Sequence, residues 1–489
     1  MTDNRWKYTL KILAHIVVLG IAAITTILCF FSFSSSYSEY NLIWFLPLIF
    51  CFVYILVYLH LLRSKNIFIT KLFFGVFSFV RCVLIPLFIA LAGPSYAGVR
   101  YITLPVSSIR FATLITVYEV LVASLFIYLL SKNNKNKIID NTKNMRFMGN
   151  KKIYIIYLIF SVFLYLIFGR KTNLLSLFAF SLSGDKFSNI ESAGLLFVRQ
   201  VVVCAIIVAF IWSISYCKKN FEQTRKTKYV NLAILSALFN VSVIVGDRRS
   251  IQVYTALISI WILTKIFDEH KKRIIISICS VAFLVIFLMT MYRLGAFKYG
   301  SYLAAYRESN LNITWLTNTL QMYFGGPDSV ATAIVYGQNS NLGLLNIVFD
   351  FVRSCFGFNF VLKDLMYTTT QSFNYYLYNG SQLTGQLIPS GSYGYIYFGL
   401  IGIPSIVCIN IWISSVLEKL LYKTKSYEMA YVYGYSLIRI SVAIYSNTPT
   451  VITFITTMIG TMGLVYLAAR IFVRKYYKKT ILLENNMIV

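Results

Sequence analysis

Four arginines stand where their guanidinium groups could bind a diphosphate. Arg248 and Arg249 follow Gly246-Asp247 in a tight turn between two apolar blocks, and Arg293 and Arg307 follow a later block. A guanidinium stays charged and can hold phosphate oxygens through two parallel hydrogen bonds. For a single arginine, pairing with a carboxylate or an anionic headgroup remains an alternative. For the Arg248–Arg249 pair together with Arg293 or Arg307, we favour binding of a lipid diphosphate.

Two carboxylates on the same side of the apolar blocks are candidates for a general base. Glu308 directly follows Arg307, and Asp328 follows Gly325-Gly326-Pro327, a turn that could fix its side chain. The three histidines, His15, His60 and His270, lie within or at the opposite ends of the blocks, which excludes a histidine base or a histidine-ligated metal beside the arginines.

Metal and cofactor motifs are missing from the arginine-rich segments. Two close carboxylates could hold Mg²⁺ or Ca²⁺, but no Asp-x-Asp or Glu-x-Asp pair occurs there. The sequence also lacks a Walker A motif and a glycine-rich dinucleotide fingerprint. We therefore expect chemistry that needs neither metal nor cofactor.

Tyrosines accompany these charged residues and are candidates for sugar binding. Tyr302 and Tyr306 are spaced for one helix face beside Arg307, and Tyr323 precedes the glycine turn. Aromatic faces suit sugar rings, but tyrosines also pack at the bilayer surface, and this alternative stays open.

The elements that must position these residues are membrane helices. The chain has 489 residues, of which 58% are hydrophobic and only 13% are charged. Its apolar residues form blocks of about 20, the length that crosses a bilayer as a helix. The sequence predicts an all-α polytopic membrane protein with about a dozen spans, near residues 10–33, 42–62, 68–91, 111–130, 153–168, 195–215, 230–245, 251–266, 274–291, 393–416, 429–445 and 450–469.

The distribution of basic residues predicts the topology. With the amino terminus inside, 30 of the 45 lysines and arginines fall in the cytoplasmic segments. Both termini are then cytoplasmic, and the net charge of +28 reflects this sidedness and not a nucleic-acid surface. We divide the chain into residues 1–291 with nine spans, a long extracytoplasmic loop at 292–392, and residues 393–489 with three spans and a basic tail.

Arg81, Glu119 and Arg439 lie inside apolar blocks, where a charge is costly. Glu119 could form an interior ion pair with one of the arginines, or the three charges could form the floor of a substrate crevice. The sequence favours neither interpretation, so both stay open.

The chain resembles the Wzy-type polymerases of O-antigen and capsular repeat units. The resemblance rests on the many helices, the outer turn Gly246–Ser250, one long outer loop, and the segments Tyr323–Pro327 and Pro389–Gly402. Such proteins are similar to the GT-C glycosyltransferases and to the O-antigen ligases, which use an outer histidine that is missing here.

The resemblance implies a membrane glycosyltransferase of the bacterial cytoplasmic membrane. A growing glycan on polyprenyl (undecaprenyl) diphosphate would move as a block onto a lipid-linked repeat unit. Arg248, Arg249, Arg293 or Arg307 would stabilise the departing diphosphate, and Asp328 or Glu308 would serve as base. The implied partners are lipid-linked oligosaccharides, membrane lipids, and a chain-length regulator and flippase of the same pathway.

Two other functions remain as alternatives. A lipid-linked oligosaccharide flippase would explain the charges inside the apolar blocks, but it predicts two similar halves and no long outer loop. An O-antigen ligase or a sugar acyltransferase comes third, because such enzymes need a histidine or a serine-based centre.

Overall fold

The computed structural model describes residues 2–33, 39–59, 66–93, 96, 98, 102–133, 140–169, 175–177, 193–245, 249–309, 311–362 and 365–473. This part of the chain is almost entirely helical. Its strands are β1 (Leu175–Leu177) and β2 (Val243–Val245), which pair antiparallel with Leu175 opposite Val245. The all-α architecture predicted from the apolar blocks is therefore confirmed.

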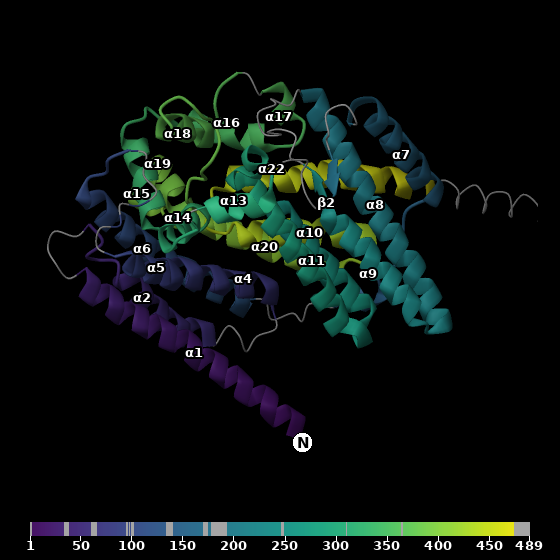
Figure 1. Cartoon of the computed structure of the whole chain (residues 1–489), viewed down its shortest axis with the longest axis horizontal. Helices are drawn as coiled ribbons and strands as arrows, with labels where there is room; N and C mark the ends of the chain where they lie inside the picture. Colours follow the sequence, from purple (N-terminus) through teal and green to yellow (C-terminus); the bar gives the residue numbers. More distant parts are fainter. Residues whose placement is uncertain are drawn as a thin grey trace, which may run out of the picture. The chain divides into compact units, whose positions relative to one another are not determined.

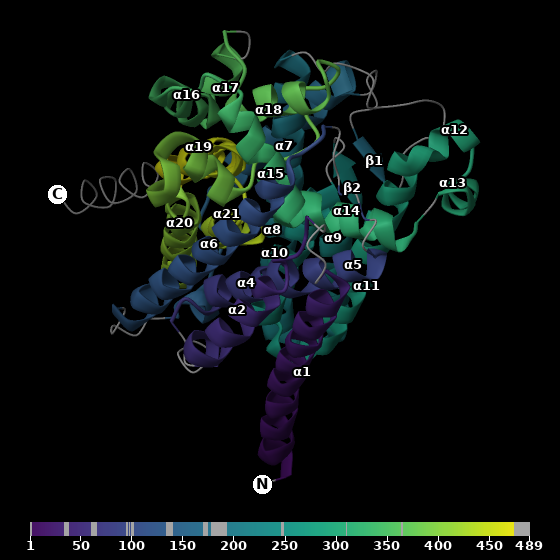
Figure 2. The ribbon, with the colours of Figure 1, turned by 90° about the vertical axis from the view of Figure 1, so that its left-hand side faces the viewer.

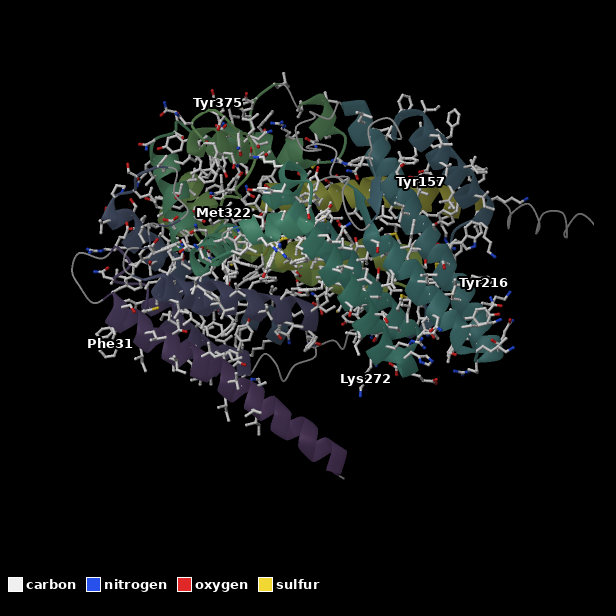
Figure 3. All side chains as sticks on the ribbon, in the orientation of Figure 1. Phe31, Tyr157, Tyr216, Lys272, Met322 and Tyr375 are labelled. Carbon is white, nitrogen blue, oxygen red and sulfur yellow. The ribbon has the colours of Figure 1, made fainter. Side chains whose placement is uncertain are left out.

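Eight helices in the described ranges are long and apolar enough to cross a membrane: Ile12–Ser32, Phe68–Ala92, Val106–Lys132, Lys151–Phe168, Phe197–Thr224, Asp268–Ala296, Ser405–Lys423 and Thr448–Val473. Two shorter apolar helices span Phe45–Tyr58 and Ile251–Ile266. These helices turn large apolar side chains outward; Phe31, for example, is 73% exposed and points away from its helix (Figure 3). Such surfaces suit lipid and are those of a multi-pass membrane protein. The count of twelve spans stays a prediction.

The chain folds into two compact units, each made of separate stretches of sequence. Figure 1 labels helices of both units. The first unit contains Met1–Lys137, Leu311–Glu418 and Arg439–Phe454, and the second contains Ile138–Asn310, Lys419–Ile438 and Ile455–Val489. The chain passes from one unit to the other within α20 (Ser405–Lys423), α21 (Tyr427–Val442) and α22 (Thr448–Met458).

The amino-terminal helices of the first unit surround a continuous apolar core. They are α1 (Thr2–Ser32), α2 (Phe45–Val53), α4 (Phe68–Phe79), α5 (Ile85–Ala92) and α6 (Val106–Asn133). Two wider π-helical turns, η1 (Tyr54–Tyr58) and η2 (Val80–Leu84), continue α2 and join α4 to α5. Pro86 follows η2 and lacks an N–H, so regular i→i−4 bonding cannot continue through it. Helical irregularities of the η2 kind are frequent at functional sites.

The second unit is a bundle of long helices. Its members are α7 (Lys151–Leu164) with η4 (Tyr165–Gly169), α8 (Ala193–Thr224), α9 (Thr227–Ser242), α10 (Arg249–Ile266) and α11 (Lys271–Met291). The short helical turn η3 (Thr142–Asn144) precedes α7, η5 (Asp268–His270) joins α10 to α11, and η7 (Ile459–Gly463) extends α22. Helices α8, α9, α10 and α11 pack in sequence against one another.

Much of the segment 292–392 is helical. It contains η6 (Tyr292–Ala296) and seven further helices: α12 (Phe297–Tyr299), α13 (Tyr302–Glu308), α14 (Ile313–Phe324), α15 (Pro327–Gln338), α16 (Leu344–Ser354), α17 (Phe358–Val361) and α18 (Thr369–Leu377). Helix α15 is buried along most of its length and packs against α6 and α19 (Ser390–Gly402). Its small residues allow this close packing, and at twelve residues it is too short to have been recognised from hydropathy.

The single helix predicted over 393–416 is wrong. Helix α19 leaves helical geometry at Gly399 (φ 62°, ψ −152°), and α20 begins only at Ser405, after Pro404. At this break the backbones of Gly394 and Gly402 come so close that a Cβ on Gly394 would lie 2.0 Å from the Gly402 carbonyl oxygen. Only glycine fits such an approach.

Candidate functional site

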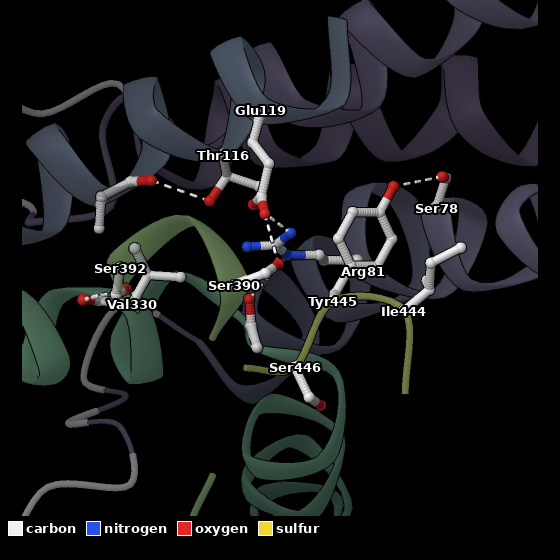
Figure 4. A network of polar contacts seen from close by, with 12 residues as sticks. Ser78, Arg81, Thr116, Glu119, Val330, Ser390, Ser392, Ile444, Tyr445 and Ser446 are labelled. Carbon is white, nitrogen blue, oxygen red and sulfur yellow. Dashed lines mark hydrogen bonds and ion pairs between the residues drawn. The ribbon is translucent and has the colours of Figure 1, made fainter. Parts of the chain in front are cut away.

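An ion pair of two fully buried side chains joins η2 to α6 in the first unit (Figure 4). Arg81 on η2 donates from Nη1 to Oε2 of Glu119 on α6 over 2.6 Å, and both side chains are 0% exposed. Both helices are candidate membrane spans. Of the two interpretations left open by the sequence, the structure shows the interior pair of Glu119 with one arginine, and Arg81 is that arginine.

Arg81 makes further contacts with its remaining groups. Its Nε donates to the Gly325 carbonyl oxygen over 2.8 Å, and its guanidinium carbon lies 4.5 Å from the centre of the Tyr445 ring. The Tyr445 hydroxyl is in turn 2.6 Å from Ser78 Oγ. Among the described residues, Arg81 Nη2 has no hydrogen-bond partner. A buried donor without a hydrogen-bond partner lowers the stability of the fold. A water or a ligand oxygen could accept this hydrogen bond.

The second oxygen of Glu119 holds the start of α19. Ser390 Oγ donates to Glu119 Oε1, and the Ser390 N–H donates to the Tyr445 carbonyl oxygen over 2.9 Å. A Cβ on the next residue, Gly391, would lie 2.8 Å from Glu119 Oε2. Glycine at 391 therefore leaves room for the carboxylate.

Two glycine-containing segments meet at this ion pair. Gly325, from Tyr323–Pro327, supplies the carbonyl to Arg81, and its own Cβ position would be 3.1 Å from Pro389 Cβ. Ser390 and Gly391, from Pro389–Gly402, contact Glu119. The fold thus joins both glycine-containing segments to the charges inside the apolar blocks.

Arg439, the third charge within an apolar block, takes a different place in the first unit. Its side chain is 7% exposed, and its guanidinium carbon lies 4.1 Å from the centre of the Phe454 ring. A cation over an aromatic face gains a favourable electrostatic contact in a low-dielectric site.

Asp328 is buried and not exposed on its turn. Gly326 and Pro327 begin α15 as the turn predicts, but the Asp328 side chain is only 1% exposed. Its N–H donates to Gln321 Oε1 over 3.0 Å, and its carboxylate lies against the backbone of Gly98, where a Cβ would come within 2.6 Å of Oδ2. Direct proton transfer with a large substrate would need this packing to open.

The second unit brings together five of the predicted site residues at the end of a candidate span. Gly295 (φ 101°) interrupts η6, a conformation that favours glycine, and the chain then folds back so that α13 packs on η6 and α11. Tyr302 packs against Val285, Met289 and Tyr292, and the Tyr306 ring centre is 6.4 Å from that of Phe287. Arg293, Arg307 and Glu308 are exposed. We call these residues, with Tyr302 and Tyr306, the α13 cluster.

The remaining predicted residues are not part of the α13 cluster as described. Arg248 lies outside the described residues, and Arg249 begins α10 with only its backbone described. Tyr323 is on α14 in the first unit, and 50% of it is exposed. No group of three or more His, Cys, Asp or Glu side chains that could hold a metal ion occurs within the ranges that the structure covers.

Sequence reasoning missed Ser390, Tyr445 and Ser78 as members of the Arg81 network. Their partners are up to several hundred positions away, so no local spacing indicates the contacts. The only signal was indirect, in the glycines of the two segments that must approach a side chain closely.

A scan of the chain against protein-family models finds no match, and comparisons with curated proteins and with solved structures find none either.

Proposed function

We propose that this chain is a membrane glycosyltransferase that polymerises oligosaccharide repeat units linked to polyprenyl diphosphate. The observation that carries the proposal is the α13 cluster, in which α13, the helix of Arg307, packs on η6, which holds Arg293, and on the end of α11. Both arginines are exposed. A lipid-linked diphosphate has its charges at the membrane surface, which is where the end of a span such as α11 would place these guanidinium groups.

The proposed reaction transfers a glycan as a block. The acceptor hydroxyl oxygen bonds to the anomeric carbon of the donor glycan, and the bond from that carbon to the diphosphate oxygen breaks. The lipid diphosphate leaves with the electron pair, and the two arginines stabilise its charge. The hydroxyl proton goes to a carboxylate.

Glu308 suits the role of base better than Asp328 does. Glu308 is exposed and ends α13, the helix that also carries Arg307, so its carboxylate is accessible to a substrate at this helix end. Asp328 is enclosed by Gln321 and Gly98. We therefore assign the proton transfer to Glu308, and a role in holding the start of α15 to Asp328.

The tyrosines of the α13 cluster support the same site. Tyr306 is 51% exposed although its ring contacts Phe287, so one face is open to a sugar ring. Tyr302 is partly covered by the apolar residues of α11 and chiefly fixes α13 in place. Sugar binding at the α13 cluster is therefore proposed for Tyr306, and the role of Tyr323, on α14 of the first unit, stays a prediction from the sequence.

The test is deletion of the gene and complementation, with surface glycan separated on a gel. We expect the wild type to restore a ladder of chain lengths, and Arg293→Gln and Arg307→Gln to shorten it, with transfer lowered by about tenfold or more for each lost charge-assisted contact, or about 1.4 kcal/mol. Lys298→Gln is the matched control, because Lys298 is an exposed cation on the neighbouring α12.

Two outcomes would contradict the proposal. A full ladder of chain lengths from both arginine variants, at normal protein level, would show that Arg293 and Arg307 do not bind the diphosphate. Loss of all surface glycan on deletion, with lipid-linked repeat units stranded on the cytoplasmic face, would indicate a flippase instead.

A further inference from the structure

Helix α16 turns its apolar side outward and its polar side inward. Leu344, Leu345, Val348 and Val352 are exposed by 63%, 83%, 57% and 40%. Asp350, Arg353 and Ser354, on the other face of the same helix, are buried. The spacing of the exposed residues gives one continuous stripe along the helix.

Polar contacts within the first unit fix this orientation. Asp350 accepts hydrogen bonds from the Tyr393 hydroxyl (2.7 Å) and from the Thr369 N–H (2.9 Å), which belong to α19 and α18. Arg353 Nη1 donates to the Met366 carbonyl oxygen and to Gln371 Oε1, both over 2.7 Å. With its two charged residues held in this way, α16 cannot roll to hide the apolar stripe.

The apolar surface continues beyond α16. Phe358 and Val361 of α17 are exposed by 55% and 76%, and Leu365 and Met366 follow. Among the described residues from 344 to 362, every exposed side chain is apolar, and both charged side chains are buried. We call Leu344, Leu345, Val348, Val352, Phe358 and Val361 the α16–α17 face.

A loop exposed to water turns its charged side chains outward and its apolar side chains inward, and the segment 344–362 does the reverse. Each exposed apolar side chain gains free energy on leaving water, and a contiguous patch of this kind marks a binding surface. The same outward pattern occurs on the candidate spans, for example at Phe283 (73%) and Ile276 (65%) of α11. A helix of 11 residues is about 16 Å long, so α16 is too short to cross the hydrocarbon layer.

The neighbours of α16 keep it close to a bilayer. The preceding helix, α15, packs against the candidate span α6, and the following helices lead through α19 into the candidate span α20. Figure 2 shows α16 and α17 side by side, at the end of the first unit away from the amino terminus of α1. A short helix that is polar inside and apolar outside, beside membrane spans, is typical of an interfacial anchor.

We propose that the α16–α17 face inserts into the bilayer, in the leaflet opposite the amino terminus of α1, and that acyl chains of membrane lipids cover it. The segment between α15 and α19 then lies on the membrane surface and does not project into the aqueous phase. The inference rests on exposure and contacts alone and does not depend on the proposed function.

Photocrosslinking of the full-length protein tests the proposal. Benzoylphenylalanine replaces Leu345 or Val348, whose side chains are exposed and make no packing contribution to the core, and the protein is placed in nanodiscs of phosphatidylethanolamine and phosphatidylglycerol. Asn341, an exposed polar residue just before α16, is the matched control position. After irradiation, intact mass spectrometry counts lipid adducts.

We expect adducts of one phospholipid mass at 345 and 348, roughly fivefold or more above position 341, because the stripe lies among acyl chains and the control does not. Crosslinked dimers without lipid adducts would show that a second copy covers the face and would overturn the proposal. Equal adduct levels at all three positions, or none at any of them, would overturn it as well. Size-exclusion elution like that of the wild type confirms that each labelled variant is folded.

Discussion

A single charged residue inside an apolar block lowers the stability of the fold, and the Arg81–Glu119 pair shows how a partner charge reduces this loss. Each charge is stabilised by the other over 2.6 Å, and Gly325, Ser390 and the Tyr445 ring surround them. A buried pair adds little net stability relative to apolar residues, but a single remaining charge is strongly destabilising. The pair therefore acts as a unit.

Removal of one partner of the Arg81–Glu119 pair should destabilise the protein far more than removal of both partners. We expect Glu119→Leu to lower the free energy of unfolding by about 3–5 kcal/mol, because Arg81 is left buried and unpaired. The double variant Arg81→Met/Glu119→Leu should recover most of this loss. The measurement is the melting temperature of the purified protein in detergent, with the exposed Lys272→Met as control (Figure 3). Equal losses in the single and double variants would show that the two residues are not coupled.

Asp350 links stability to pH. Burial raises the pKa of its carboxyl above the ordinary value of 3.8, although the hydrogen bonds from Thr369 and Tyr393 act in the opposite direction. The folded state therefore holds the proton more tightly than the unfolded state. The resulting stabilisation is complete below pH 3.8 and is lost as the pH rises through the raised value.

Asp350→Asn should remove this pH dependence, because asparagine is neutral at every pH. Relative to the variant, the wild type should lose melting temperature as the pH rises from about 4 through the raised pKa. Melting curves of both proteins across this window are the measurement. Parallel curves would mean that Asp350 does not titrate differently in the folded state.

At the scale of single elements, the break in α19 replaces a predicted membrane helix with a bent one. Gly394→Ala should destabilise the protein by about 1–3 kcal/mol, because the new Cβ meets the backbone of Gly402, which no side-chain rotation can relieve. Gly20→Ala is the matched control, since nothing lies within 4 Å of its Cβ position and alanine favours a helix. Melting temperatures that fall equally in both variants would argue against the close approach.

The sequence predicts the helices well where their hydropathy alone determines their bounds. The apolar blocks at 10–33, 68–91 and 111–130 correspond to α1, to the α4–η2–α5 helix and to α6. The pattern fails at α15, whose burial depends on neighbours far away in the chain, and at α19, where two backbones touch. Neither effect leaves a periodic signal.

The candidate site could be predicted only in part, for a similar reason. Pairing of Glu119 with an arginine was one of two interpretations that the sequence left open, because a lone charge in an apolar block needs a partner. Gly325 and Ser390 were not recognisable as partners, because their contacts with Arg81 and Glu119 join positions 244 and 271 residues apart. Local spacing did predict that Tyr302, Tyr306 and Arg307 share one helix, which α13 confirms.

At the scale of the whole molecule, the distribution of basic residues makes a topological prediction. Fusions of green fluorescent protein at the carboxyl terminus should fluoresce, because that terminus is expected in the cytoplasm. Alkaline phosphatase fused after Tyr378 should be active, because residues 292–392 are expected outside. Swapping the two reporters provides the control. An active phosphatase at the carboxyl terminus would place that terminus outside and overturn the predicted topology.

The Arg81 network also has a consequence for biogenesis. Arg81 is made 38 residues before Glu119 and 244 residues before Gly325. At a synthesis rate of about 5–20 residues per second, the arginine waits roughly 2–8 s for its counter-ion and roughly 10–50 s for the carbonyl. During the first wait, the nascent α4–α5 segment carries an uncompensated cation, so we expect its insertion and that of α6 to be completed together, as a hairpin. The carboxyl-terminal third of the chain then closes the network only at the end of translation.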